Sequence, residues 1–227
     1  NLVKNNVEII YFNSPGLAES SRLCLELSGI SWKDTTVNNE EYIKLKNDNI
    51  LPYGLLPILK TSQGIIAESA ALLRYTGALA GLEPENLFMR AKVDEILDVM
   101  RGWWESFTPT FYIEDIEKKI ISRRNLFDEG GKLDLGMKLL SSLYENSDTG
   151  WLANTEFMSI ADIKMFTDVF LLFSGQFDGL DKSIILKYPT LLEFHDKMSN
   201  VPGIKLYYSN KKESIEHWVY YPKSFDN

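Results

Sequence analysis

Hydrophobic residues follow two different periods along this chain of 227 residues. In the first part, short runs rich in β-branched and aromatic residues alternate with stretches whose apolar positions recur at helical spacing. The elements that this pattern predicts are strands at 7–12, 56–60 and 65–67, helices at 18–28 and 68–79, and a polar stretch at 37–49. The order indicates a βαβ opening followed by a hairpin and a helix, which is typical of a small α/β domain.

After residue 86, strand patterns nearly vanish and apolar residues recur every three to four positions, the period of an amphipathic helix. The predicted helices span residues 87–112, 114–125, 131–146, 159–173, 188–199 and 204–213. Glycines and a proline at residues 77–84 mark the change of pattern. The sequence therefore predicts an α/β domain at 1–81 and an all-helical domain at 82–227.

Charge and cysteine content narrow the class of protein. The net charge is −8 and the lysines and arginines are scattered, so we expect neither a nucleic acid nor an anionic membrane as a partner. No apolar run is long enough to span a bilayer or to form a signal peptide. The single cysteine, Cys24, excludes an intrachain disulfide and favours a reducing compartment. We expect a cytoplasmic protein.

Two short motifs suggest a binding site. Proline removes a ladder donor, so Pro57 is expected at an edge or at the first residue of its strand, where it leaves the backbone of Leu56 unpaired. The pair Glu68-Ser69 stands at the start of a predicted helix, where amide groups and the positive end of the helix dipole attract a carboxylate. These motifs predict a frame that binds a ligand through backbone groups.

Four motifs occur in an order and at distances that resemble one family over almost the whole chain. They are residues 11–19 (Tyr-Phe-Asn-Ser-Pro-Gly-Leu-Ala-Glu), 53–57 (Tyr-Gly-Leu-Leu-Pro), 68–75 (Glu-Ser-Ala-Ala-Leu-Leu-Arg-Tyr) and 159–162 (Ser-Ile-Ala-Asp). The set resembles the cytosolic glutathione transferases of the tyrosine type, sigma-like with some pi-like features. The resemblance implies a thioredoxin-like N-terminal domain, an all-helical C-terminal domain, glutathione as co-substrate, no metal, and a homodimer.

The resemblance makes Tyr11 the catalytic residue, and elementary chemistry agrees. A thiol with a pKa near 8.5 is mostly protonated at neutral pH, whereas the thiolate is the nucleophile. Lowering that pKa by about two units requires roughly 2.7 kcal/mol, and one charge-assisted hydrogen bond supplies about 1.5 to 3 kcal/mol. A tyrosine hydroxyl at a strand end can therefore supply most of the effect. Leu17, however, stands where relatives carry a supporting arginine.

The resemblance also implies the residues that hold the tripeptide. Ser69 would bind the γ-glutamyl carboxylate, with Glu68 facing the α-ammonium, and Leu56 would hold the cysteinyl backbone beside Pro57. Positions that bind the glycyl end in relatives align loosely with Tyr42, Lys44, Lys46 and Leu55. Ordinary structural roles remain open at this stage, since a serine can simply begin a helix and a proline can simply end a loop.

An electrophile pocket is expected to include Phe12, Trp104, Phe107 and Phe111. Aromatic residues at helical spacing are equally typical of a helix packed into a core. The leading hypothesis is a detoxification enzyme that conjugates glutathione to small hydrophobic electrophiles. A sigma-like isomerase of the prostaglandin D synthase type and a non-catalytic ligandin or structural protein remain as alternatives, the latter favoured by Leu17.

Overall fold

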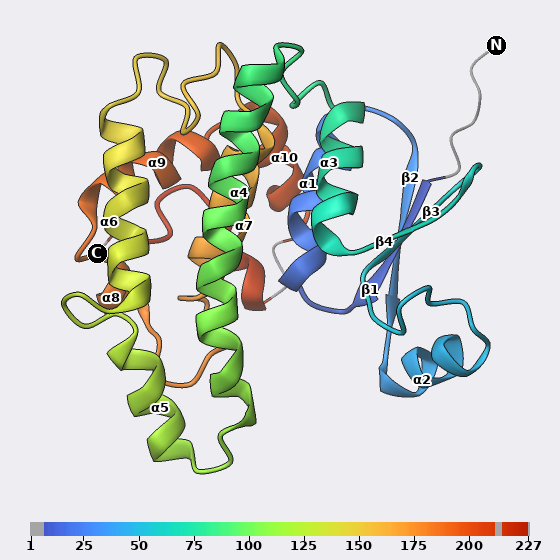
Figure 1. Ribbon diagram of the computed structural model, residues 1–227, viewed down its shortest axis with the longest axis horizontal. Helices are drawn as coiled ribbons and strands as arrows, with labels where there is room; N and C mark the ends of the chain where they lie inside the picture. The colour runs from blue at the N-terminus through green and yellow to red at the C-terminus, as the bar shows by residue number, and fades with distance from the viewer. Residues whose placement is uncertain (1–6, 212–214, 227) are drawn as a thin grey trace. The chain divides into compact units, whose positions relative to one another are not determined.

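The computed structural model describes residues 7–211 and 215–226, and the chain forms two compact units (Figure 1). One unit ends at Glu83 and the other begins at Pro84, whereas the sequence analysis placed the division after Gly81. Each unit has its own arrangement of elements and is described by itself.

A mixed four-stranded sheet forms the centre of the first unit. Its strands are β1 (Val7–Phe12), β2 (Trp32–Val37), β3 (Ile58–Thr61) and β4 (Gly64–Ala67), in the order β2-β1-β3-β4. β1 pairs with β2 in parallel, and the other pairs are antiparallel. The three strands predicted from sequence are confirmed. β2 escaped prediction because this edge strand carries Lys33, Asp34 and two threonines, and most of its residues remain at least partly exposed.

Three α-helices and a short 3₁₀ helix complete this unit. They are η1 (Gly16–Ala18), α1 (Glu19–Leu27), α2 (Asn39–Asn47) and α3 (Ser69–Leu79). α1 and α3 lie side by side, and α2 lies apart from them (Figure 1). The stretch interpreted as merely polar thus contains α2, which begins with a capping box: Asn38 Oδ1 accepts from the Glu41 amide at 3.0 Å, and Glu41 Oε2 accepts from the Asn38 amide at 2.8 Å.

The position of Pro57 excludes the edge and favours the start of a strand, the second of the two expected positions. β3 lies between β1 and β4, so it is an interior strand rather than an edge. Pro57 stands immediately before Ile58, the first residue of β3, and therefore removes no hydrogen bond from the ladder. The backbone groups left for a ligand belong to the segment before the strand.

The second unit is helical throughout its described residues. Its elements are α4 (Leu87–Phe107), η2 (Thr108–Tyr112), α5 (Ile116–Asn125), α6 (Lys132–Glu145), α7 (Ile160–Leu171), α8 (Lys182–Ile185), α9 (Pro189–Ser199), α10 (Pro202–Ser209) and η3 (Ile215–Tyr220). Each predicted helix has a counterpart, although the first changes to 3₁₀ geometry at Thr108, next to Pro109. The last ends at Ser209, and its predicted residues 212 and 213 lie outside the described part of the chain. The short elements α8 and η3 were not predicted.

α7 is the central helix of this unit, because eleven of its residues are buried. It begins with the predicted capping box, in which Asp162 Oδ2 accepts from the Ser159 amide at 2.8 Å. α4 and α6 run beside each other (Figure 1), and Trp103 packs directly over Gly136. A Cβ added at Gly136 would come within 2.6 Å of the Trp103 ring. The absence of a side chain at Gly136 thus allows the two helices to approach closely.

Candidate active site

The strand register brings three site residues of the first unit together at one end of the sheet. The last row of paired residues across β1, β3 and β4 consists of Ile10, Ile58 and Ala67. One residue beyond this row are Tyr11, Pro57 and Glu68, on strands that lie about 4.8 Å apart. Segments distant in sequence therefore meet at this end.

The Tyr11 hydroxyl is held by the chain that follows its own strand. The Leu17 amide donates a hydrogen bond to the Tyr11 oxygen, with 3.3 Å between the two atoms. A hydroxyl that accepts from an amide is polarised toward donating its own proton. Tyr11 is largely buried and packs edge-to-face against Phe12, with 5.5 Å between the ring centroids.

Gly16 makes this arrangement possible. Its φ of +43° lies in the left-handed region that favours glycine. An added Cβ would lie 2.7 Å from the Tyr11 hydroxyl oxygen and 2.8 Å from its Cε1, closer than any unstrained contact. The chain can pass beside the phenol ring only without a side chain at this position.

The Arg22 guanidinium lies on the other side of the same loop. Arg22 is 2% exposed, and its carbon Cζ lies 5.7 Å from the centroid of the Tyr11 ring, within the range of a cation–π contact. Its Nε donates to Asp34 Oδ1 at 3.0 Å, and its Nη1 lies 3.3 Å from Glu19 Oε2. The cation beside Tyr11 therefore comes from α1, and not from position 17.

Leu56 presents its backbone in the way that binding a peptide requires. The Leu56-Pro57 bond is cis. Among the described residues, no hydrogen bond joins the Leu56 amide or carbonyl to another part of the chain. An amide and a carbonyl on one residue are the pair that an added strand uses in an antiparallel ladder. The Leu56 side chain is buried, while Leu55 is 59% exposed beside it.

The start of α3 offers two amide groups. Glu68 is the N-cap residue, with φ 71° and ψ 118°, a conformation rare for residues other than glycine. Its carbonyl accepts from the Ala71 and Leu72 amides. Within the described residues, the Ser69 and Ala70 amides and the Ser69 hydroxyl make no hydrogen bond to the chain. Ser69 is the first helical residue rather than the N-cap, so its groups are available to an anion.

α2 places one lysine, and not two, beside this frame. The Tyr42 hydroxyl donates to the Gly54 carbonyl at 2.8 Å, which fixes α2 against the loop before Pro57. The Lys46 side chain lies beside the same glycine, 3.4 Å from where a Gly54 Cβ would be. Lys44 is two residues earlier, about 200° around the helix, and thus lies on a different face. Tyr42 also packs against Phe12, with centroids 5.5 Å apart.

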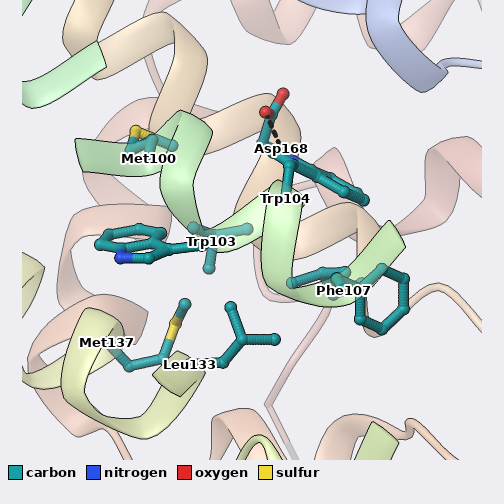
Figure 2. A pocket seen from close by; sticks show the side chains of 9 residues that line it. Met100, Trp103, Trp104, Phe107, Leu133, Met137 and Asp168 are labelled. Atoms are coloured by element: carbon teal, nitrogen blue, oxygen red, sulfur yellow. Dashed lines mark hydrogen bonds between the residues drawn. The ribbon is translucent and has the colours of Figure 1, made fainter. Parts of the chain in front are cut away.

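The aromatic residues predicted for the electrophile pocket are divided between the units. Phe12 packs against the core of the first unit. Trp104 is half-buried and donates from Nε1 to Asp168 Oδ2 at 2.7 Å, as the dashed line in Figure 2 shows. Phe107 is 1% exposed, whereas Phe111 is 46% exposed. Phe107 is thus a core residue of α4 rather than the wall of an open pocket.

Figure 2 shows the cavity beside these rings, which is lined by Met100, Trp103, Trp104, Phe107, Leu133, Met137, Asp168, Val169 and Leu172. Its volume of about 10 Å³ is close to that of a single water probe. A conjugation substrate does not fit there. The cavity is a packing defect around Trp103 and Trp104 inside the second unit.

Across residues 7–211 and 215–226, no group of three or more His, Cys, Asp or Glu side chains is arranged to hold a metal ion. In the same part of the chain, no helix combines the length and hydrophobicity that crossing a membrane requires.

Comparison with known proteins shows which family this chain resembles. Residues 101–211 match the family model described as "Glutathione S-transferase, C-terminal domain". The chain is 26% identical over 214 residues to "Glutathione S-transferase 3" of Caenorhabditis elegans, covering 91% of this chain and 97% of that protein. These matches support a cytosolic glutathione S-transferase. The transferase is also similar to "Hematopoietic prostaglandin D synthase" of Gallus gallus, at 26% identity over 88% of this chain and 93% of that one.

Solved structures give the same result for the fold. The structure titled "prostaglandin synthase D of Nilaparvata lugens" has a TM-score of 0.79 and 25% identity, covering 91% of the transferase and 98% of that chain. The predicted fold class, a thioredoxin-like domain followed by an all-helical one, is therefore confirmed.

Two residues beside Tyr11 were not predicted from the sequence, although a local sequence feature marks each of them. Gly16 follows Pro15 directly after the first strand, and such a pair marks a tight turn. Arg22 is a charge among the apolar positions of α1, and a charge on a buried helix face requires a partner. Neither signal indicates by itself that the residue lies beside Tyr11.

Proposed function

We propose that this glutathione S-transferase activates the thiol of glutathione with the hydroxyl of Tyr11. The observation that carries the proposal is the hydrogen bond from the Leu17 amide to the Tyr11 oxygen, at 3.3 Å. This bond orients the phenol and strengthens the hydrogen bond that its O–H donates to a thiolate. It also supplies, from the backbone, part of the support that an arginine at position 17 would give.

The tripeptide is proposed to lie along the end of the sheet. Its cysteinyl residue pairs with the amide and carbonyl of Leu56, as an added antiparallel strand would. Its γ-glutamyl carboxylate accepts hydrogen bonds from the Ser69 and Ala70 amides at the start of α3, and its α-ammonium faces the Glu68 carboxylate. Lys46, beside Gly54, is the cation that we assign to the glycyl carboxylate.

The proposed second substrate is a small hydrophobic electrophile, which the thiolate attacks. Phe12, which packs edge-to-face against Tyr11, is the aromatic residue of the first unit that we assign to it. A homodimer in the cytoplasm is proposed on the basis of family membership.

Substitution of Tyr11 tests the proposal. We expect Tyr11→Phe to lower turnover of a chloronitrobenzene substrate at least tenfold, because one charge-assisted hydrogen bond of about 1.5 to 3 kcal/mol is lost. The dissociation constant of glutathione, measured by calorimetry, should change little. Tyr144→Phe, which removes a hydroxyl from α6 in the second unit, is the matched control and should leave turnover unaltered. Unchanged turnover in Tyr11→Phe would exclude this role for the residue.

An endoperoxide isomerase is the second candidate, since two of the similar proteins bear the name prostaglandin D synthase. The two candidates share Tyr11 and glutathione and differ in product. Conjugation consumes one glutathione per turnover, whereas isomerisation regenerates it. Measuring glutathione consumption with a chloronitrobenzene and with a prostaglandin endoperoxide therefore separates them.

A further inference from the structure

Arg22 does more than form an ion pair. Its Nη1 donates to the carbonyl oxygens of Ser14 at 2.8 Å and of Pro15 at 3.3 Å, and its Nη2 donates to the carbonyl of Phe12 at 3.4 Å. The Phe12 carbonyl ends β1, and the other two belong to the short loop that follows the strand. A single planar guanidinium thus holds the end of β1 and the loop at three points.

The same loop delivers the groups that fix the tyrosine. Gly16 passes against the Tyr11 ring, and the Leu17 amide donates to the Tyr11 hydroxyl at 3.3 Å. A hydrogen bond of this length weakens quickly when the donor moves away or turns. Any motion of the loop carbonyls toward solvent would move the Leu17 amide with them.

The charges of the cluster do not explain the arrangement. Arg22 forms ion pairs with Glu19 of α1 and Asp34 of β2, and within the described residues this cation and its two carboxylates sum to a formal charge of −1. A net negative cluster beside the phenol would raise, and not lower, the pKa of a neighbouring thiol. Arg22 can therefore assist acidification of the thiol only through its hydrogen bonds to the loop carbonyls, and not through the net charge of the cluster.

We propose that Arg22 is a positioning residue for catalysis: it locks residues 12–15 so that the Leu17 amide stays on the Tyr11 hydroxyl. This inference rests on the proposed function, because it assumes that Tyr11 stabilises the thiolate. The guanidinium acts on the Tyr11 hydroxyl through the loop, in addition to its direct contact with the Tyr11 ring.

The test measures the pKa of enzyme-bound glutathione from the ultraviolet absorbance of its thiolate as pH rises. Arg22→Lys keeps the charge and loses the fork that bridges the carbonyls. We expect the pKa of the bound thiol to rise by about one unit, which reduces the thiolate fraction about tenfold at pH values below that pKa. A purely structural role would lower activity and leave this pKa unchanged, which would overturn the inference.

A pair of substitutions at Asp34 avoids replacing the buried arginine. Asp34 is partly exposed, and its Oδ1 accepts from Arg22 Nε. Asp34→Asn removes the charge and keeps an acceptor oxygen, so the pKa of the bound thiol should stay within about 0.3 units. Asp34→Ala removes the same charge and the acceptor as well, and should raise that pKa. If the pKa of the bound thiol fell equally in both variants, the cluster would act through its charge, and the inference would be overturned.

Arg123→Lys is the matched control. Arg123 is also buried, lies 5.3 Å from the centroid of an aromatic ring, Phe107, and donates to a loop carbonyl, that of Asp178, but all these partners belong to the second unit. The pKa of the bound thiol should not change in this variant. Failure of the underlying function is distinguishable, because wild type and Tyr11→Phe would then show the same thiol pKa.

Discussion

At the scale of single residues, the site depends on how closely the backbone approaches the phenol ring. The Leu17 amide donates to the Tyr11 hydroxyl, so the position of the loop decides the strength of this hydrogen bond. A Cβ added at Gly16 would lie only 2.7 Å from the Tyr11 hydroxyl oxygen. This proximity makes Gly16 a sensitive point at which to test the geometry.

We expect Gly16→Ala to lower kcat/KM at least tenfold, because the new Cβ must displace either the Tyr11 ring or the loop. The positive φ adds a stability cost of about 1 kcal/mol. Gly29→Ala is the control, since Gly29 has a φ of +68° but no atom within 4 Å of the added Cβ. It should show the stability cost in urea unfolding and retain full activity. Equal activity losses in the two variants would contradict a steric role for Gly16.

Local motifs predicted some of these residues and could not predict others. Tyr11 and Ser69 follow from a strand end and a helix start, each of which is encoded by adjacent residues. Arg22 was missed because its carbonyl partners become neighbours only after the loop has folded. Lys44 and Lys46 could not be distinguished, since their different faces become apparent only once the polar stretch is known to be helical.

At the scale of elements, the packing of α4 against α6 is the most specific contact of the second unit. Gly136 lies under Trp103, whereas Gly102, the preceding residue on α4, faces open space. Both glycines are in the interior of an α-helix, where replacement by alanine gains roughly 0.5–1 kcal/mol if the new methyl group fits. Substitution by alanine is therefore expected to change the stability of the protein in opposite directions at the two positions.

We expect Gly102→Ala to stabilise the protein by roughly 0.5–1 kcal/mol. Gly136→Ala should destabilise it by about 1–3 kcal/mol, because overpacking against Trp103 exceeds the helical gain. The midpoints of urea unfolding measure both. Stabilisation by Gly136→Ala would mean that Trp103 can move aside without cost.

The elements that sequence patterns missed share a physical cause. β2 is an edge strand, so much of its surface remains in contact with water and its residues do not need to be apolar. α2 has no buried residue, which removes the hydrophobic period that identifies a helix, although its Asn38 and Glu41 form a recognisable capping box. Elements that bury little apolar surface lack a hydrophobic period, so only their capping residues can identify them in the sequence.

At the scale of the whole molecule, acid sensitivity should arise in part from one histidine. His195 is buried among aromatic rings, and its Nε2 donates to the Val219 carbonyl at 2.7 Å, joining α9 to the C-terminal η3. Burial lowers the pKa of His195 to about 4, against the opposing effects of that carbonyl and of the Asp196 and Asp226 carboxylates. The unfolded chain, with a pKa near 6.5, binds this proton first.

Stability should therefore be complete above pH 6.5 and fall as pH decreases toward 4, by about 3 kcal/mol from this residue. His195→Gln retains a donor for the Val219 carbonyl and does not titrate. As pH falls from 6.5 to 4, the unfolding free energy of wild type should decrease relative to that of this variant. Above pH 6.5 and below pH 4 the difference should be constant. A difference independent of pH would contradict a neutral buried histidine.

The Cys24 thiol is protected from alkylation by the electrophilic substrates of the transferase. The side chain is 0% exposed, and burial raises the pKa of its thiol to about 12. A protein that turns a bound thiol into a strong nucleophile encounters reactive electrophiles at every turnover, and any exposed thiol of its own would be consumed with the substrate. The single cysteine of this chain is protonated and out of reach, so alkylation falls on glutathione and the catalyst survives.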